Sequence, residues 1–107
     1  MDELTFEKIA RTELSYIEDQ LFDVDPDDVE VSSSDGVLTL ELRDGVRVVV
    51  NSHRAARQIW MAAVASAWHF DFDAGDQRWR TPGTPSHELR ATLQRVIKER
   101  VGLDVVL

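Results

Sequence analysis

Carboxylates crowd one short stretch of the sequence, and their oxygens could bind a cation. Seven aspartates and glutamates occur between residues 18 and 30, with no lysine or arginine among them. Carboxylates suit hard, hydrated cations such as Ca²⁺ and Fe²⁺, and a set that stays open to water binds them weakly and with little selectivity. The candidate metal ligands, which we call the acidic ridge, are Glu18, Asp19, Asp23, Asp25, Asp27, Asp28 and Glu30.

A run of like charges is also the ordinary composition of a solvated surface that keeps a protein soluble. Two features favour a binding role instead. Asp19 and Asp23 are spaced i,i+4 on a predicted helix, where like charges cost roughly 0.2–0.5 kcal/mol. They also lie near the negative end of the helix dipole, where Lys or Arg would stabilise the helix. A sequence selected for stability alone would not place carboxylates at these positions.

Strand periodicity brings a second group of side chains together. Residues 67–72 form a predicted strand, in which successive side chains point to opposite faces. The three aromatic residues of this strand share one face, which belongs to the core, while His69 and Asp71 share the other. The tryptophans and phenylalanines predicted to be buried in this region are Trp68, Phe70, Phe72 and Trp79.

The strand predicted before it, over residues 58–64, places a tryptophan on the open face. Ile59 and Met61 point toward the core, so Trp60 points away from it. An exposed tryptophan beside amide and imidazole groups is typical of a protein-binding hot spot. The candidate partner-binding residues, which we call the open-face cluster, are Asn51, Gln58, Trp60, His69 and Asp71.

Six strands and a leading helix must position these two groups. Apolar residues recur every three or four positions from residue 3 to 24, which predicts an amphipathic helix that Pro26 ends. Two Asp-Gly pairs, at 35–36 and 44–45, predict two-residue hairpin turns. Alanine and methionine favour helix over residues 55–67, but the order of the elements favours strands there. The predicted strands are 29–34, 37–42, 46–51, 58–64, 67–72 and 78–81.

A second helix is predicted near the end of the sequence. Thr84 is its predicted cap, Pro85 suits its first turn and Gly102 suits its exit. The predicted fold class is α+β, with two helices packed on one face of an antiparallel β-sheet and the other face open to solvent. Residues 1–107 are predicted to form one domain.

Composition narrows the classes of function. The net charge of −8 argues against nucleic acid as a ligand, because lysine and arginine are needed to neutralise phosphates. The charge is uneven: residues 1–44 contain 14 acidic and 3 basic side chains, which indicates an interaction surface. The start lacks the features of a signal peptide, and no apolar run approaches the roughly 20 residues that span a bilayer, so we expect a soluble, cytoplasmic protein without a membrane partner.

No constellation of residues indicates a catalytic site. The absence of cysteine excludes a thiolate nucleophile and a cysteine-based metal site. The sequence contains no GxSxG, no glycine-rich phosphate loop and no HExxH motif. Nothing around His53 or His87 indicates a role for either histidine.

Taken in order, these residues resemble the frataxin family, and specifically its bacterial members. In that family a strand-end asparagine precedes a Gln-apolar-Trp strand and then a His-aromatic-Asp strand. The same spacing occurs here without a gap, at Asn51, Gln58-Ile59-Trp60 and His69-Phe70-Asp71, and the order of elements agrees over nearly the whole chain. The departures are His53 for a usual Gln, Ala55 for Pro, Ser66-Ala67 for a Gly-Gly turn, and Arg11 and Phe22 at two usually acidic positions.

The resemblance implies an α-β sandwich that binds iron, as Fe²⁺ or Fe³⁺, weakly through the acidic ridge and regulates iron–sulfur cluster assembly. It implies a cysteine desulfurase and a cluster scaffold protein as partners, a monomeric state without iron and an oligomer that depends on iron. Oxidation of Fe²⁺ at the acidic ridge is the one enzymatic activity that it leaves open. The alternative is an acidic protein-interaction module with no metal role, which binds a basic protein surface or mimics nucleic acid.

Overall fold

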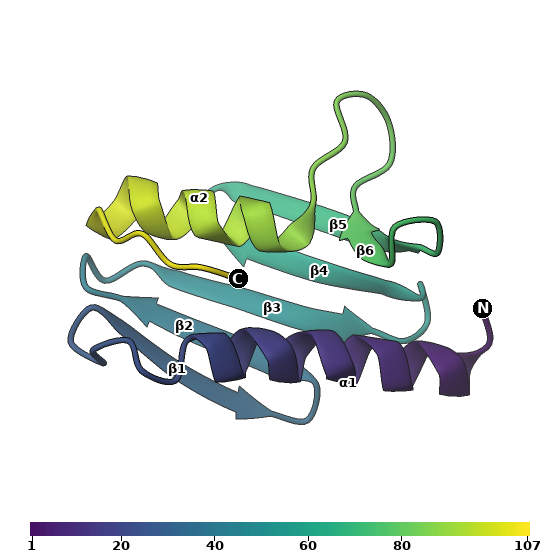
Figure 1. The fold of residues 1–107 in the computed structure, drawn as a ribbon, viewed down its shortest axis with the longest axis horizontal. Coiled ribbons are helices and arrows are strands. Elements are labelled where there is room, and N and C mark those ends of the chain that lie inside the picture. The colour runs from purple at the N-terminus through teal and green to yellow at the C-terminus, as the bar shows by residue number, and fades with distance from the viewer.

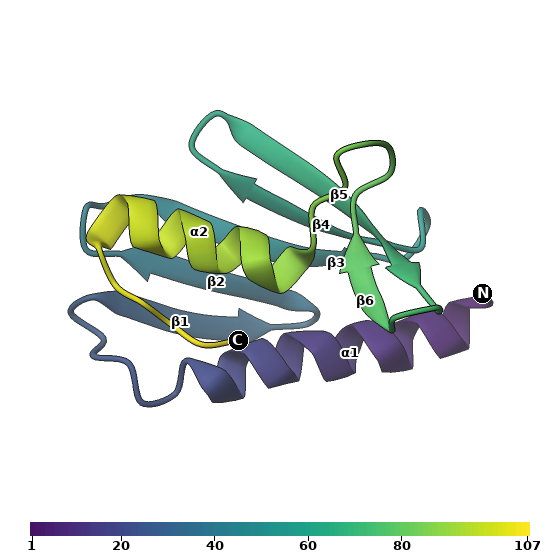
Figure 2. The same ribbon diagram turned by 45° about the horizontal axis from the view of Figure 1, so that its top comes forward.

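Two layers make up the molecule: a six-stranded antiparallel sheet and a pair of helices that cover one of its faces (Figure 1). The strands lie in sequence order across the sheet, and a tilted view shows both helices on the same side of it (Figure 2). This arrangement confirms the predicted α+β fold. The computed structural model describes residues 1–107, in the order α1 (Glu3–Gln20), β1 (Val29–Ser34), β2 (Val37–Leu42), β3 (Arg47–His53), β4 (Gln58–Ala63), β5 (Ser66–Asp73), β6 (Arg78–Arg80) and α2 (Leu89–Val101).

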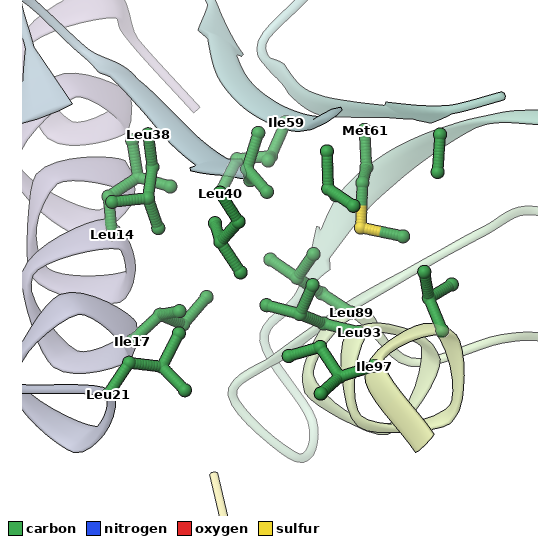
Figure 3. Close-up of a cluster of buried hydrophobic side chains, with 14 of the residues drawn as sticks. Leu14, Ile17, Leu21, Leu38, Leu40, Ile59, Met61, Leu89, Leu93 and Ile97 are labelled. Atoms are coloured by element: carbon green, nitrogen blue, oxygen red, sulfur yellow. The ribbon is translucent and has the colours of Figure 1, made fainter. Parts of the chain in front are cut away.

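The core lies between the helices and the inner face of the sheet. In β2, Leu38 and Leu40 are 0% exposed and Leu42 is 3% exposed, as the alternation of this strand predicts. Figure 3 shows Leu38 close to Leu14 of α1, and Leu40 between the side chains of α1 and the leucines of α2. Full burial of one such aliphatic side chain stabilises the fold by about 1.5–3 kcal/mol.

Helix α1 is shorter than its apolar pattern predicts. It begins after the N-cap Asp2, whose carboxylate accepts a hydrogen bond from the backbone N–H of Thr5 at 2.7 Å; that bond lowers the pKa of Asp2. It ends at Gln20, and Leu21 caps it, although the apolar pattern continues to Val24. No basic residue occupies the last turn to stabilise the negative end of the helix.

The early end of α1 corrects one prediction about the acidic ridge. Asp23 lies beyond the helix, in the turn that follows Leu21. Asp19 and Asp23 are therefore not an i,i+4 pair on one helix, and the repulsion calculated for that geometry does not apply.

Of the two Asp-Gly turns, one has the predicted geometry. Asp35 and Gly36 have φ values of +47° and +79° and connect β1 to β2 in two residues, as predicted. A Cβ at Gly36 would lie 2.6 Å from Ser52 Oγ, so the Ser52 side chain would have to rotate and give up its hydrogen bond to Gly36 O. The prediction for Asp44-Gly45 is wrong: Leu42 N–H donates to Val46 O at 2.8 Å, so residues 43–45 form a three-residue loop.

The turn between β4 and β5 lies one residue earlier than the sequence predicts. The turn between β4 and β5 consists of Val64 and Ala65, whereas Ser66 and Ala67 pair within β5. Val64 has a φ of +55°, which is costly for a β-branched residue, and its side chain is 67% exposed.

Helix α2 starts later than predicted. Thr84 and Pro85 lie in the preceding loop, and Glu88 caps the helix by accepting the N–H groups of Arg90 and Ala91. Its exit is as predicted, with Gly102 in the left-handed region at φ +71°.

An ion pair at the interface of the helices ties α1 to α2. Arg90 donates two hydrogen bonds to the Glu13 carboxylate, at 2.8 and 2.9 Å, and its guanidinium lies 3.9 Å from the centre of the Tyr16 ring. The exposed fractions of the Glu13 and Arg90 side chains are 7% and 16%, so water screens the pair little. Hydrogen bonding to Glu13 raises the pKa of Arg90, which keeps the guanidinium charged.

Removing one charge of this pair should destabilise the fold strongly. Glu13→Leu leaves a nearly buried guanidinium without its partner, and we expect a loss of about 3–5 kcal/mol in the free energy of unfolding. Glu13→Leu/Arg90→Met should recover most of that loss, because two apolar side chains of similar volume replace the pair. Denaturant titration measures both.

The exposed pair of Lys98 and Asp104 provides the control. Asp104→Ala should cost no more than about 1 kcal/mol, since the Asp104 side chain is 83% exposed. If the double variant were as unstable as Glu13→Leu alone, packing rather than charge would explain the effect.

Candidate functional site

The acidic ridge follows the end of α1, the connection to β1 and the start of that strand, at the left of Figure 1. Three of its members are bonded within the chain. Glu18 accepts a hydrogen bond from Ser33 Oγ at 2.9 Å, Asp25 accepts one from the backbone N–H of Asp27 at 2.9 Å, and Asp28 pairs with Arg43. The members that form no ion pair and whose carboxylates accept no hydrogen bond from the chain are Asp19, Asp23, Asp27 and Glu30.

These carboxylates do not converge on one point. No group of three or more acidic or histidine side chains is arranged to hold a metal ion. The acidic ridge therefore provides a broad negative surface, at which a cation would keep most of its water and exchange readily. Such a surface attracts cations and basic proteins through its summed charge rather than through a fixed set of ligands.

The open-face cluster lies on the uncovered face of the sheet, where β3, β4 and β5 run side by side. Register places Asn51, Trp60 and His69 in one row across the three strands. Asp71 lies one row further along, opposite Gln58, at the spacing predicted for alternating strands. The structure thus brings all five predicted members together on one face.

Hydrogen bonds connect the cluster internally. Trp60 Nε1–H donates to Gln58 Oε1 at 2.8 Å, and Gln58 Nε2 donates to Asp71 Oδ1 at 3.0 Å. The amide of Gln58 is fixed in one orientation by these two bonds. The indole N–H is therefore already satisfied within the chain.

A third ring, which the sequence did not single out, completes the site. The imidazole of His53 stacks on one face of Trp60, with ring centroids 3.8 Å apart and planes inclined by 14°. His69 stacks on the other face, at 4.3 Å and 14°. The signal for His53 was its position two residues after Asn51, which places it on the same open face.

The other aromatic residues that were predicted to be buried differ in how deeply they are buried. Trp79 is 1% exposed and makes edge-to-face contacts with Phe6 and Phe72, at centroid distances of 5.9 and 5.3 Å. Trp68 and Phe72 are half-buried and pack against the core, and Phe70 is fully buried. Trp60 is half-buried as well, because its imidazole neighbours cover it and no helix does.

A hollow lies elsewhere, between α1 and the β1–β2 turn. It has a volume of about 660 Å³ and is lined mainly by polar side chains. It includes Glu18 of the acidic ridge and no residue of the open-face cluster. The open-face cluster therefore does not line this hollow. No helix of the protein is long and apolar enough to cross a membrane.

Comparison with known proteins agrees with this architecture. A family model described as a frataxin-like domain matches residues 1–103. A protein of Pseudomonas fluorescens strain Pf0-1, named "Iron-sulfur cluster assembly protein CyaY", is 29% identical over 104 residues, which cover 97% of this chain and 93% of that protein. The protein of the same name from Ralstonia pickettii strain 12J is 34% identical over 110 residues, covering 100% of this chain and 95% of the relative.

Solved structures show the same fold. Frataxin from Psychromonas ingrahamii superposes with a TM-score of 0.87 at 22% sequence identity, covering 98% of this chain and 96% of that one. Trimeric frataxin from Saccharomyces cerevisiae, solved in complex with ferrous iron, gives a TM-score of 0.74 at 25% identity, covering 89% and 87% of the two chains.

The different environments of two tryptophans lead to a prediction. Trp60→Ala removes two stacked aromatic pairs, each worth about 0.5–1.5 kcal/mol, so we expect a loss of about 1–3 kcal/mol in the free energy of unfolding. Trp79→Ala, in the core, should cost about 3–5 kcal/mol. Chemical denaturation of the two variants checks the order, and equal losses would place Trp60 in the core.

Proposed function

The chain belongs to the frataxin-like family, and from this premise we propose that it acts in iron–sulfur cluster assembly, as an adaptor that contacts the assembly proteins and binds iron weakly. The observation that carries the proposal is the stacked and hydrogen-bonded cluster around Trp60 on the uncovered face of the sheet. An open sheet face that holds a large aromatic side chain in one orientation has the character of a protein contact. Relatives named as cluster assembly proteins identify the machinery in which we expect the partner.

The expected partners are a cysteine desulfurase and the scaffold protein on which clusters form. The open-face cluster provides the close contact, because the indole N–H of Trp60 and the amide of Gln58 are already bonded within the chain and cost little to desolvate. The acidic ridge provides the long-range attraction, because most of its carboxylates have no basic neighbour in the chain.

Weak iron binding is assigned to the acidic ridge. Its oxygens are the ligand type for a hard divalent cation, and their spread fits several loosely held ions better than one caged ion. The frataxin of Saccharomyces cerevisiae that was solved with ferrous iron supports this assignment by family relationship.

A second candidate function is an acidic interaction module with no metal role. The observation that favours it is Phe22, whose side chain is 84% exposed in the middle of the acidic ridge. A bare aromatic ring contributes nothing to a site for a hydrated cation, whereas it can contact the apolar stems of basic side chains on a partner protein.

A reconstituted assay tests the leading proposal. Cluster formation on a purified scaffold, supplied with desulfurase, cysteine and Fe²⁺, should change in rate when this protein is added. Trp60→Ala should weaken that effect by at least about tenfold in the concentration needed, which corresponds to about 1.4 kcal/mol. If the protein left the rate of cluster formation unchanged at every iron concentration, the proposal would be wrong. An effect on that rate that does not depend on iron would favour the interaction module.

Metal binding should appear in thermal stability at low ionic strength. Fe²⁺ under anaerobic conditions, or Ca²⁺, should raise the melting temperature, because a ligand that binds only the folded state stabilises it. Asp19→Lys/Asp23→Lys should raise the metal-free melting temperature by relieving repulsion within the acidic ridge, and should reduce the further rise caused by metal. Calorimetry measures both effects.

The matched control carries the same change of net charge outside the acidic ridge. Glu99→Lys/Asp104→Lys alters two acidic side chains at α2 and the segment after it, and should leave the metal-dependent rise intact. Equal losses in the two double variants would show that metal responds to total charge and not to the acidic ridge.

A further inference from the structure

We propose that His53 is a positioning residue, which fixes the indole of Trp60 so that a partner meets only its edge. The inference rests on the proposed function, since it concerns docking at the open-face cluster. It assigns a role to a histidine that lies outside the predicted cluster, and it specifies the kind of partner surface that the site fits.

The imidazole of His53 is held independently of Trp60. Its Nδ1 accepts a hydrogen bond at 3.3 Å from the backbone N–H of Ala56, in the turn that follows β3. In the same turn, Arg57 N–H donates to Arg54 O at 3.1 Å, which fixes the backbone of the turn directly after the histidine. With Nδ1 acting as acceptor, the neutral ring carries its hydrogen on Nε2 and its plane is set by the turn.

The other flanking ring has no such anchor. His69 is exposed, and its side chain forms no hydrogen bond or ion pair within the chain. It leans on Trp60 from the β5 side, whereas His53 supports Trp60 from the β3 side. Of the two imidazoles, only His53 can therefore transmit a fixed orientation to the indole.

The order of the stack determines how Trp60 can be used. Both faces of the indole are covered, at centroid distances of 3.8 and 4.3 Å, and its N–H is bonded to Gln58. A partner can neither stack on the ring nor accept a hydrogen bond from it without breaking an existing contact. What remains is the apolar edge of the indole between the edges of two imidazoles.

This surface fits a flat aliphatic patch of a partner protein, which contacts the edge of the indole. Neighbouring open-face residues agree with an apolar contact, because Ala62 and Ala67 face one another across β4 and β5, one row from Trp60 and His69. A ring that is already ordered loses little conformational entropy on binding, which favours affinity.

Three variants test the proposal. His53→Ala removes the support, His53→Phe keeps a ring that can stack but has no nitrogen, and His87→Ala alters a half-buried histidine away from the site. The readouts are the NMR shifts and line widths of the Trp60 ring protons, the denaturant midpoint, and the affinity for a purified desulfurase–scaffold complex.

We expect His53→Ala to mobilise the Trp60 ring and to weaken binding about tenfold, mainly through faster dissociation, with a small change in midpoint. His53→Phe keeps a ring that can stack but loses the hydrogen bond from Ala56 N–H, so it should restore ring order and affinity only in part, and His87→Ala should change neither. The proposal is overturned if the Trp60 signals of His53→Ala match those of the wild type. A His53→Phe variant that matches the wild type in ring order and affinity also overturns it, because stacking would then position Trp60 without the anchored imidazole.

The ring signals need no partner, so they decide whether His53 orients Trp60 even if the wild type fails to bind the complex. That failure would instead contradict the proposed function. A retained affinity in His53→Ala, with a mobile Trp60 ring, would show that ring order is irrelevant to docking and would overturn the inference.

Discussion

Alternation of side chains along the strands is the constraint on which the rest of the structure depends. Because each strand presents every second residue to the helices, the sheet can bury a continuous apolar layer and still hold polar and aromatic groups on its reverse. Ile59 and Met61 are almost fully buried, while Trp60 between them belongs to the open face. A slip of one residue in the register of β4 would turn Trp60 toward the core and Ile59 and Met61 toward solvent. Both the core and the open-face cluster would then be disrupted.

In the proposed function, the two surfaces act over different distances. The acidic ridge is a set of exposed charges beside the edge strand β1, whose field reaches about 8 Å at physiological salt. The open-face cluster, on β3 to β5, acts only on contact, and its one carboxylate, that of Asp71, is engaged by Gln58. Attraction and fit are thus separated in space, so each can change without altering the other.

Sequence patterns predicted most of the fold because the signals were local. Period-two alternation identified the buried and open residues of β2, β4 and β5, and Gly102 identified the end of α2. Thr84 was a plausible cap by residue type alone. The cap is instead Glu88, which directly precedes the helix and accepts hydrogen bonds from two backbone N–H groups. The stack at His53 needed the register between strands, which one sequence does not state. A glutamate at position 13, on the apolar stripe between Ala10 and Ile17, was a visible signal of a buried partner, yet the partner itself is 77 residues away.

The sequence separation of Glu13 and Arg90 affects the order in which the protein folds. The sheet is a meander whose strands pair with their chain neighbours, so it can assemble through short loops. The contact between Glu13 and Arg90 joins the first and last helices on one face of the sheet. It closes a loop that contains all six strands, and the entropic cost of closing that loop is high until the strands have paired. We infer that the two helices lock together after the rate-limiting barrier. The ion pair then governs how slowly the native protein opens rather than how quickly it forms.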